Sequence, residues 1–166
     1  MRIEQFVALS VGEWKSMRSG HSLAFQVFEE VLSTINIELV DIKNQIIQNM
    51  LDKTIYSESE ALTPFKISWK ANSNWENADK SSKSSGNCYL IPIPESKTEG
   101  ILIRSIGYIE EIDSISNYKF SDDQTFILKT AYNNTIIEER IWFISNNVRC
   151  RSSVVLSSNG KSILQT

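Results

Sequence analysis

Short segments rich in β-branched and aromatic residues, separated by turn-forming residues, make up most of the chain after residue 62. Such segments lack helical spacing and predict consecutive β-strands. Asn133-Asn134 and Asn146-Asn147 stand where tight turns would join strands, because Asn tolerates positive φ. An antiparallel meander of this kind removes its edges by closing into an up-and-down barrel of about eight to ten strands, with room inside for one small ligand. The expected strands are residues 65–71, 88–93, 100–108, 118–120, 125–132, 135–144 and 148–156.

The first part of the chain has the 3.6-residue spacing of apolar residues that is typical of helices. We expect helices at residues 3–11 and 22–35, the second with a broad apolar face, and a short third helix within residues 42–51. A further strand is expected to follow Gly12-Glu13-Trp14. The chain has 166 residues, the length of one domain, so we predict a single all-β domain with added α-helices over residues 1–166.

Alternation along the last two predicted strands gathers charged residues on one face. If these strands pair through Asn146-Asn147, Glu139, Arg149 and Arg151 share a face with Ile, Val and Phe residues. Two interpretations are open. The face can point to solvent, where ion pairs contribute little, or into the barrel, where buried arginines need a neutralising partner. A ligand with two carboxylates suits the second case, because the two arginine Cα atoms lie roughly 6.8 Å apart and each guanidinium can bind one carboxylate.

Composition excludes several classes of function. The net charge of −3 argues against a nucleic-acid-binding surface. Cys88 and Cys150 with a single His cannot form a four-ligand zinc site, and we expect both thiols to be inert and no metal to be bound. No apolar run could span a bilayer and the first residues lack a signal-peptide pattern, so we expect a cytoplasmic protein without membrane partners. A Gly-rich phosphate loop and a GxSxG motif are also missing from the sequence.

Longer segments carry a more specific signal. The Gly-x-Trp at residues 12–14 resembles the signature of lipocalin-like barrels, in which the Trp plugs the closed end. The segments EWKSMRSGHSLAFQVFEEVLS, SWKANSNW, YLIPIP, ILIRSIGYIE and EERIWFISNNVRCRSSV resemble the S-type phycobiliprotein lyases, the CpcS/CpeS family, and the resemblance runs from residue 2 to about residue 160. It implies a lipocalin-like antiparallel barrel with added helices. It also implies an enzyme that binds an open-chain tetrapyrrole (a bilin) and delivers it to a phycobiliprotein cysteine, where a thioether forms.

The resemblance further implies roles for individual residues. Glu139 matches the acid that contacts the pyrrole nitrogens and assists proton transfer, and His21 matches a functional residue of the N-terminal motif. The ligand-binding matches are Arg18, Trp69, Trp75, Arg149, Arg151 and Ser153. Alternatives stay open: Trp69 could be an ordinary core residue. In a regular strand Arg18 and His21 have opposite parity, so both reach one cavity only if Gly20 marks a bulge or the strand ends there.

The implied ligand is phycoerythrobilin or phycocyanobilin, which is transferred and is not a permanently bound cofactor. The implied partner is an apo-phycobiliprotein α or β subunit, of phycoerythrin or phycocyanin type, and homodimers are common among relatives. Two functions share such a pocket, a chromophore lyase and a non-catalytic bilin carrier. A generic fatty-acid binder is disfavoured, because several arginines and a glutamate on cavity faces are more polar than an acyl chain can use.

Overall fold

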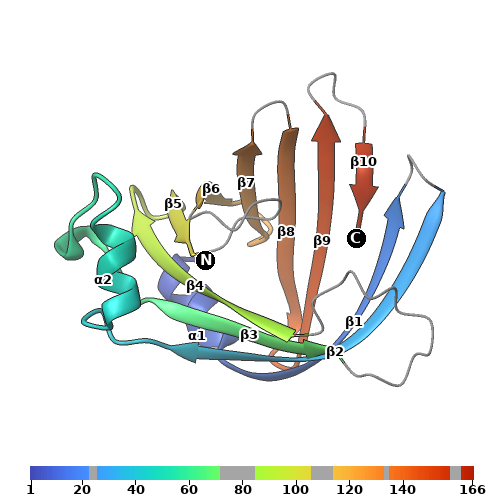
Figure 1. Ribbon diagram of the computed structural model, residues 1–166, viewed down its shortest axis with the longest axis horizontal. Coiled ribbons are helices and arrows are strands. Elements are labelled where there is room, and N and C mark those ends of the chain that lie inside the picture. The colour runs from blue at the N-terminus through green and yellow to red at the C-terminus, as the bar shows by residue number, and fades with distance from the viewer. Residues whose placement is uncertain (23–25, 72–84, 106–113, 133–134, 158–161) are drawn as a thin grey trace.

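The structure, a computed structural model, describes residues 1–22, 26–71, 85–105, 114–132, 135–157 and 162–166. Over these residues ten strands form one closed antiparallel barrel, in which each strand pairs with its neighbours in sequence and the last pairs with the first (Figure 1). The predicted fold class, a lipocalin-like up-and-down barrel with added helices, is therefore confirmed. The strands are β1 Gly12–Ser22, β2 Val27–Leu39, β3 Phe65–Ala71, β4 Ser85–Pro94, β5 Glu99–Arg104, β6 Ser114–Phe120, β7 Phe126–Tyr132, β8 Thr135–Ser145, β9 Val148–Ser157 and β10 Ser162–Gln165.

Most predicted strands agree with observed ones. β3 has the predicted bounds, and β6 begins four residues before the predicted 118. Asn146-Asn147 forms the turn between β8 and β9, whereas Asn133-Asn134 lies outside the described residues. The short strand β10, which closes the barrel against β1, was not predicted.

The prediction of a helix at residues 22–35 is wrong, because this segment supplies most of β2. The strand pairs with β1 without interruption, from Gly12 opposite Ile37 to Ser22 opposite Val27. Its apolar residues lie on both faces: Ile37 is buried inside, whereas Phe28 is 55% exposed outside. Apolar residues on two faces of a strand imitate helical spacing, and pairing on both sides of β2 overrides that local pattern.

Helix α1 (Ile3–Ser10) packs against one end of the barrel interior, and its buried face includes Phe6. The Phe6 ring stacks on Phe126 with centroids 4.3 Å apart. Trp14 Nε1 donates a hydrogen bond to the Ser10 carbonyl at 2.9 Å, which fixes the helix to the start of β1. The chain turns between α1 and β1 at Gly12, whose φ of +134° is disfavoured for residues with a side chain. Trp14 thus lies at the end of the barrel that α1 occupies.

Helix α2 (Gln45–Leu51) and the 3-10 turn η1 (Glu58–Glu60) lie outside the barrel. The Asn44 side chain caps α2 by accepting a hydrogen bond from the Ile46 amide. The helix buries Ile47 against a second apolar cluster on the outer face of β4 and β5, which includes Ile91 and Ile103. The inner faces of these strands are therefore left for the barrel interior.

Candidate functional site inside the barrel

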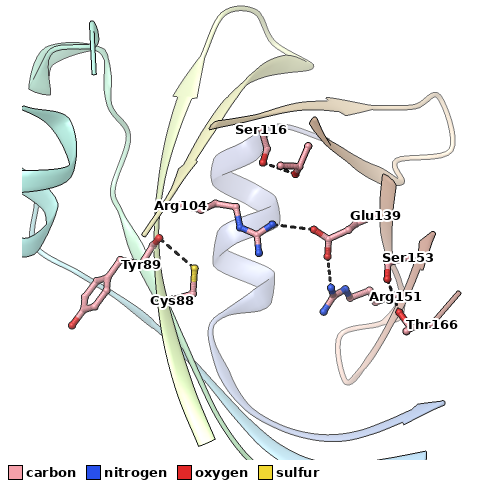
Figure 2. A network of polar contacts seen from close by, with 9 residues as sticks. Cys88, Tyr89, Arg104, Ser116, Glu139, Arg151, Ser153 and Thr166 are labelled. Atoms are coloured by element: carbon pink, nitrogen blue, oxygen red, sulfur yellow. Dashed lines mark hydrogen bonds and ion pairs between the residues drawn. The ribbon is translucent and has the colours of Figure 1, made fainter. Parts of the chain in front are cut away.

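A buried carboxylate lies between two guanidinium groups in the barrel interior. Glu139, on β8, is 3% exposed. Arg104 Nη1, from the end of β5, is 3.2 Å from Glu139 Oε2. Arg151 Nη2, from β9, donates to the other oxygen, Oε1. Figure 2 shows Glu139 between the two arginines. Because β5 and β8 are not neighbours in the sheet, the contact of Arg104 with Glu139 crosses the interior.

Strand pairing explains why these residues meet. In the β8–β9 hairpin Glu139 lies opposite Ser153 and Ile141 lies opposite Arg151, so all four share one face. Glu139, Ser153 and Ile141 are buried, which identifies that face as the inner one. Of the two interpretations left open by the sequence, the one that places this face inside the barrel is confirmed and the solvent-facing one is wrong.

Arg149 completes a cluster that we call the arginine–glutamate cluster, which consists of Arg104, Glu139, Arg149 and Arg151. The Arg149 guanidinium lies over the Phe6 ring, 5.8 Å from its centroid. Burial lowers its pKa to about 10, and the charge of Arg151 adds to this effect. None of the described residues accepts a hydrogen bond from its buried Nε atom. With three guanidinium groups and one carboxylate, the cluster carries two positive charges in excess.

Hydroxyl groups surround the cluster on neighbouring strands. Ser153 Oγ contacts Thr166 Oγ1, and the two backbones exchange hydrogen bonds of 2.7 and 2.9 Å. Ser116 and Thr130 share a buried hydrogen bond of 2.7 Å between β6 and β7 (Figure 2). The buried Ser114 Oγ, on the strand position opposite Arg104, has no hydrogen-bond partner among the described residues. The interior therefore offers polar contacts as well as charge.

Trp69 lies on the inner face of β3 and is half-buried against the main core. It is paired with Gly86 of β4, and a side chain at position 86 would overlap the indole ring. Gly86 thus allows the ring to lie over its neighbouring strand, a partnership that our sequence analysis missed. Trp75, the other predicted aromatic contact, lies outside the described residues.

The structure separates Arg18 from His21. β1 continues to Ser22 and pairs with β2 without a bulge at Gly20, so the two residues lie on opposite faces of the strand. Arg18 shares the inner face with Trp14 and is exposed, whereas His21 is on the outer face with its ring 4.8 Å from the Phe28 ring. The condition under which both would reach one cavity is not met, and the placement of His21 in the site is corrected.

Sequence analysis missed Arg104 and Thr166. Arg104 could not have been found from alternation alone, because Ile101 and Ile103 on the outer face of β5 are as apolar as Leu102 on the inner face. A strand with apolar residues on both faces does not show which face points inwards. The contact of Thr166 depends on β10, whose four residues give a weak strand signal.

Both cysteines of the chain and the helices α1 and α2 lie within the described residues. Cys88 is buried and Cys150 is half-buried, both as free thiols. Over the described ranges no group of three or more His, Cys, Asp or Glu residues could hold a metal ion. Similarly, none of the helices described is long and apolar enough to span a bilayer.

Comparison with known proteins gives one consistent family. The sequence model of the CpeS-like protein family matches residues 2–165. The chain is 41% identical to "Chromophore lyase CpcS/CpeS 3" of Trichodesmium erythraeum, over 99% of this chain and 94% of the relative. It is 32% identical to "Chromophore lyase CpcS/CpeS" of Thermosynechococcus vestitus, over 98% and 88%. The solved structure of the S-type phycobiliprotein lyase CpeS from Guillardia theta is similar, with a TM-score of 0.82 and 30% identity over 99% of this chain and 88% of that one.

Proposed function

Because the chain belongs to the CpeS-like protein family, we propose that it is a chromophore lyase that binds a bilin and attaches it through a thioether to a cysteine of a phycobiliprotein subunit. The observation that carries the proposal is the arginine–glutamate cluster. Its two excess positive charges correspond to the two propionates of a bilin, and its carboxylate suits the pyrrole N–H groups between them.

Arg149 and Arg151 bind the propionates in this proposal. Arg149 is half-buried, and none of the described residues accepts a hydrogen bond from its buried Nε atom, so an anion would offset the cost of burying its charge. The Arg151 side chain is 44% exposed and can turn towards a ligand. Trp69 supplies an aromatic wall, Ser153 a hydroxyl, and Arg18 a further cation at the inner face of β1.

Attachment is an addition of the acceptor thiol across the exocyclic ethylidene double bond of the bilin A ring. The thiolate sulfur forms the new C–S bond, the π electrons of the double bond move into the bilin, and the proton lost by the thiol is returned to the bilin. The lyase acts by holding the bilin in one conformation and presenting the ethylidene to the thiolate. Glu139 is proposed as the group that handles the proton at the pyrrole nitrogens. His21, on the outer face, takes no part in this step.

A non-catalytic bilin carrier remains the second candidate, since it needs the same interior. The test combines the purified protein, a bilin and an apo-phycobiliprotein. A lyase accelerates formation of a covalent, correctly absorbing adduct and leaves the bilin on the acceptor after denaturation. If the protein binds the bilin but adduct formation is no faster than with free bilin, the carrier is correct. If it binds no bilin, both candidates fail.

The identity of the bilin, the acceptor subunit, the cellular compartment and the oligomeric state are proposals as well. Absorption and fluorescence titrations with phycoerythrobilin and phycocyanobilin decide which bilin is bound, and α and β subunits are compared as acceptors. We propose a cytoplasmic protein, the compartment expected from the sequence. A homodimer also stays a prediction. It is supported by apolar residues that are exposed on the outer face of β8 and β9, namely Ile136, Trp142, Ile144 and Val148. Analytical ultracentrifugation tests it by measuring the mass of the protein in solution.

A further inference from the structure

We infer that Arg104 is a positioning residue, which keeps Glu139 charged and aligned inside the barrel when Arg151 turns to the ligand. This inference rests on the proposed function. It assigns different tasks to the two arginines that contact Glu139: Arg151 exchanges the glutamate for a propionate, and Arg104 stays.

Exposure distinguishes the two arginines. The Arg104 side chain is 14% exposed and that of Glu139 is 5% exposed, whereas the Arg151 side chain is 44% exposed. The contact of Arg104 with Glu139 is therefore almost closed to solvent, while Arg151 can leave its carboxylate without crossing packed protein. A ligand that enters the interior meets the guanidinium of Arg151 more readily than that of Arg104.

Charge balance explains why a second arginine is needed. A carboxylate as deeply buried as Glu139 is strongly disfavoured without a nearby cation. If Arg151 turned to a propionate and Arg104 were missing, Glu139 would lose both guanidinium contacts and would be driven to take up a proton. With Arg104 in place, the carboxylate stays ionised and can accept hydrogen bonds from the pyrrole N–H groups.

The arrangement of strands fixes Arg104 in this task. Arg104 is the last residue of β5 and lies opposite Leu90 on one side and Ser114 on the other. Glu139 lies three strands away in the sheet, so the side chain of Arg104 spans the interior to reach it. Arg151 instead belongs to β9, which is paired with the strand of Glu139 itself.

The test is a double-mutant cycle on the full chain with Arg104→Gln, Glu139→Gln and the double variant, each titrated with phycoerythrobilin and phycocyanobilin. Arg104→Gln is expected to weaken binding roughly tenfold or more in the wild-type background and less than about threefold when Glu139 is already Gln, because contacting charges are not additive. Arg104→Lys, which keeps the charge, should recover most of the loss. Arg140→Gln, which removes an exposed guanidinium from the outer face of β8, is the matched control and should leave binding unchanged.

Spectra and melting temperatures separate a positioning role from a merely structural one. For Arg104→Gln we also expect a shifted absorption spectrum of the bound bilin, because Glu139 protonates or turns away from the pyrroles. Equal losses in both backgrounds, or a lower melting temperature with unchanged affinity and spectrum, would overturn the inference. If Arg104→Gln does not fold, Arg104→Lys decides: any loss of affinity that it causes, relative to its own parent protein, must be smaller when Glu139 is already Gln than in the native background, and equal losses would overturn the inference. Failure of the wild-type chain to bind any bilin would instead refute the proposed function.

Discussion

The two ends of the barrel interior differ in chemistry, although the same strands build both. At the end occupied by α1 the interior is aromatic: the rings of Phe120 and Phe126 lie 5.3 Å apart, and Phe6 contacts both. Towards the other end the inner residues are charged or hydroxylated. Along β6 they change from Phe120 and Tyr118 to serines, and along β7 from Phe126 to a threonine.

This gradient separates stability from binding. Aromatic rings packed against a helix stabilise the folded protein, but they offer few polar groups with which to recognise a ligand. Even the polar group at this end is kept neutral, since burial, followed by the charges of Glu4 and Glu95, raises the pKa of Tyr118 to about 12. At the opposite end the arginine–glutamate cluster keeps charges inside, where they are costly for the empty protein but complementary to an anionic ligand. Substitutions at the two ends should therefore affect different quantities.

The largest effect is expected at the charged end, for the Arg149→Ala/Arg151→Ala variant. Loss of two charge-assisted contacts to the propionates should weaken bilin binding roughly 100-fold or more, so that no complex is detected at micromolar protein. The midpoint of urea unfolding should fall less steeply than the affinity, because Arg104 still pairs with the buried Glu139 when Arg151 is removed. Absorption titration measures the affinity, with Arg140→Ala as the exposed control. Undiminished binding would show that the excess charge has no role in recognition.

At the aromatic end the expected effect is on folding. Phe120 is 7% exposed and packs on Tyr118 and Phe126, and Phe120→Ala should lower the free energy of unfolding by about 3–5 kcal/mol, as for other large buried side chains. Urea unfolding followed by fluorescence measures this. The folded fraction should still bind the bilin with an affinity within about threefold of wild type, because sites without shared contacts are nearly independent. A large loss of affinity at a temperature where the variant is folded would break the separation of the two ends.

Glu139→Gln should separate two functions within the charged end. The amide keeps the shape of the side chain, so the bilin should still bind and absorb visible light. The rate of transfer to the acceptor should fall about 100-fold, the lower part of the range for losing an acid or base. Single-turnover transfer from preloaded protein measures this rate. Glu138→Gln, one residue away on the outer face, is the control. An unchanged transfer rate would limit Glu139 to a structural role.

Some site residues could be placed from the sequence because successive side chains of a strand point to opposite faces. Alternation placed Glu139, Arg149 and Arg151 on one face, because strand geometry forces this. The same rule does not reach Arg104, because β5 is apolar on both faces. It failed at β2, where Phe28 and Leu32 are exposed on the outer face and made the segment resemble an amphipathic helix.

Contacts between distant strands could not be predicted in this way. The ion pair of Arg104 with Glu139 depends on barrel closure and diameter, which no local pattern encodes. The position of Trp69 over Gly86 depends on the register of β3 with β4. His21 illustrates the opposite case: its role was inferred from a resemblance, while its parity had already indicated that it and Arg18 face opposite sides of a regular strand, as the structure shows.

The smallest effect is a pH dependence that distinguishes ligand binding from folding. Arg149 has a pKa of about 10, below its ordinary value, so it is charged at neutral pH and loses its proton as the pH rises through about 10. A bound propionate favours the charged form, so bilin binding takes up a proton in this range and the dissociation constant should rise by up to about tenfold per pH unit. For folding without ligand the sign is reversed, because the unfolded chain keeps the proton longer and the contribution of Arg149 to stability rises with pH.

Titrations between about pH 8 and about pH 11 measure both quantities for the wild-type chain and for Arg149→Ala. The variant retains Arg151 and shares any ionisation of the bilin itself, so the difference between the two proteins isolates Arg149. Affinity should fall more steeply with pH in the wild type than in the variant. Parallel curves would mean that Arg149 does not face the anion, and the ligand would then be placed further from α1, against Arg151.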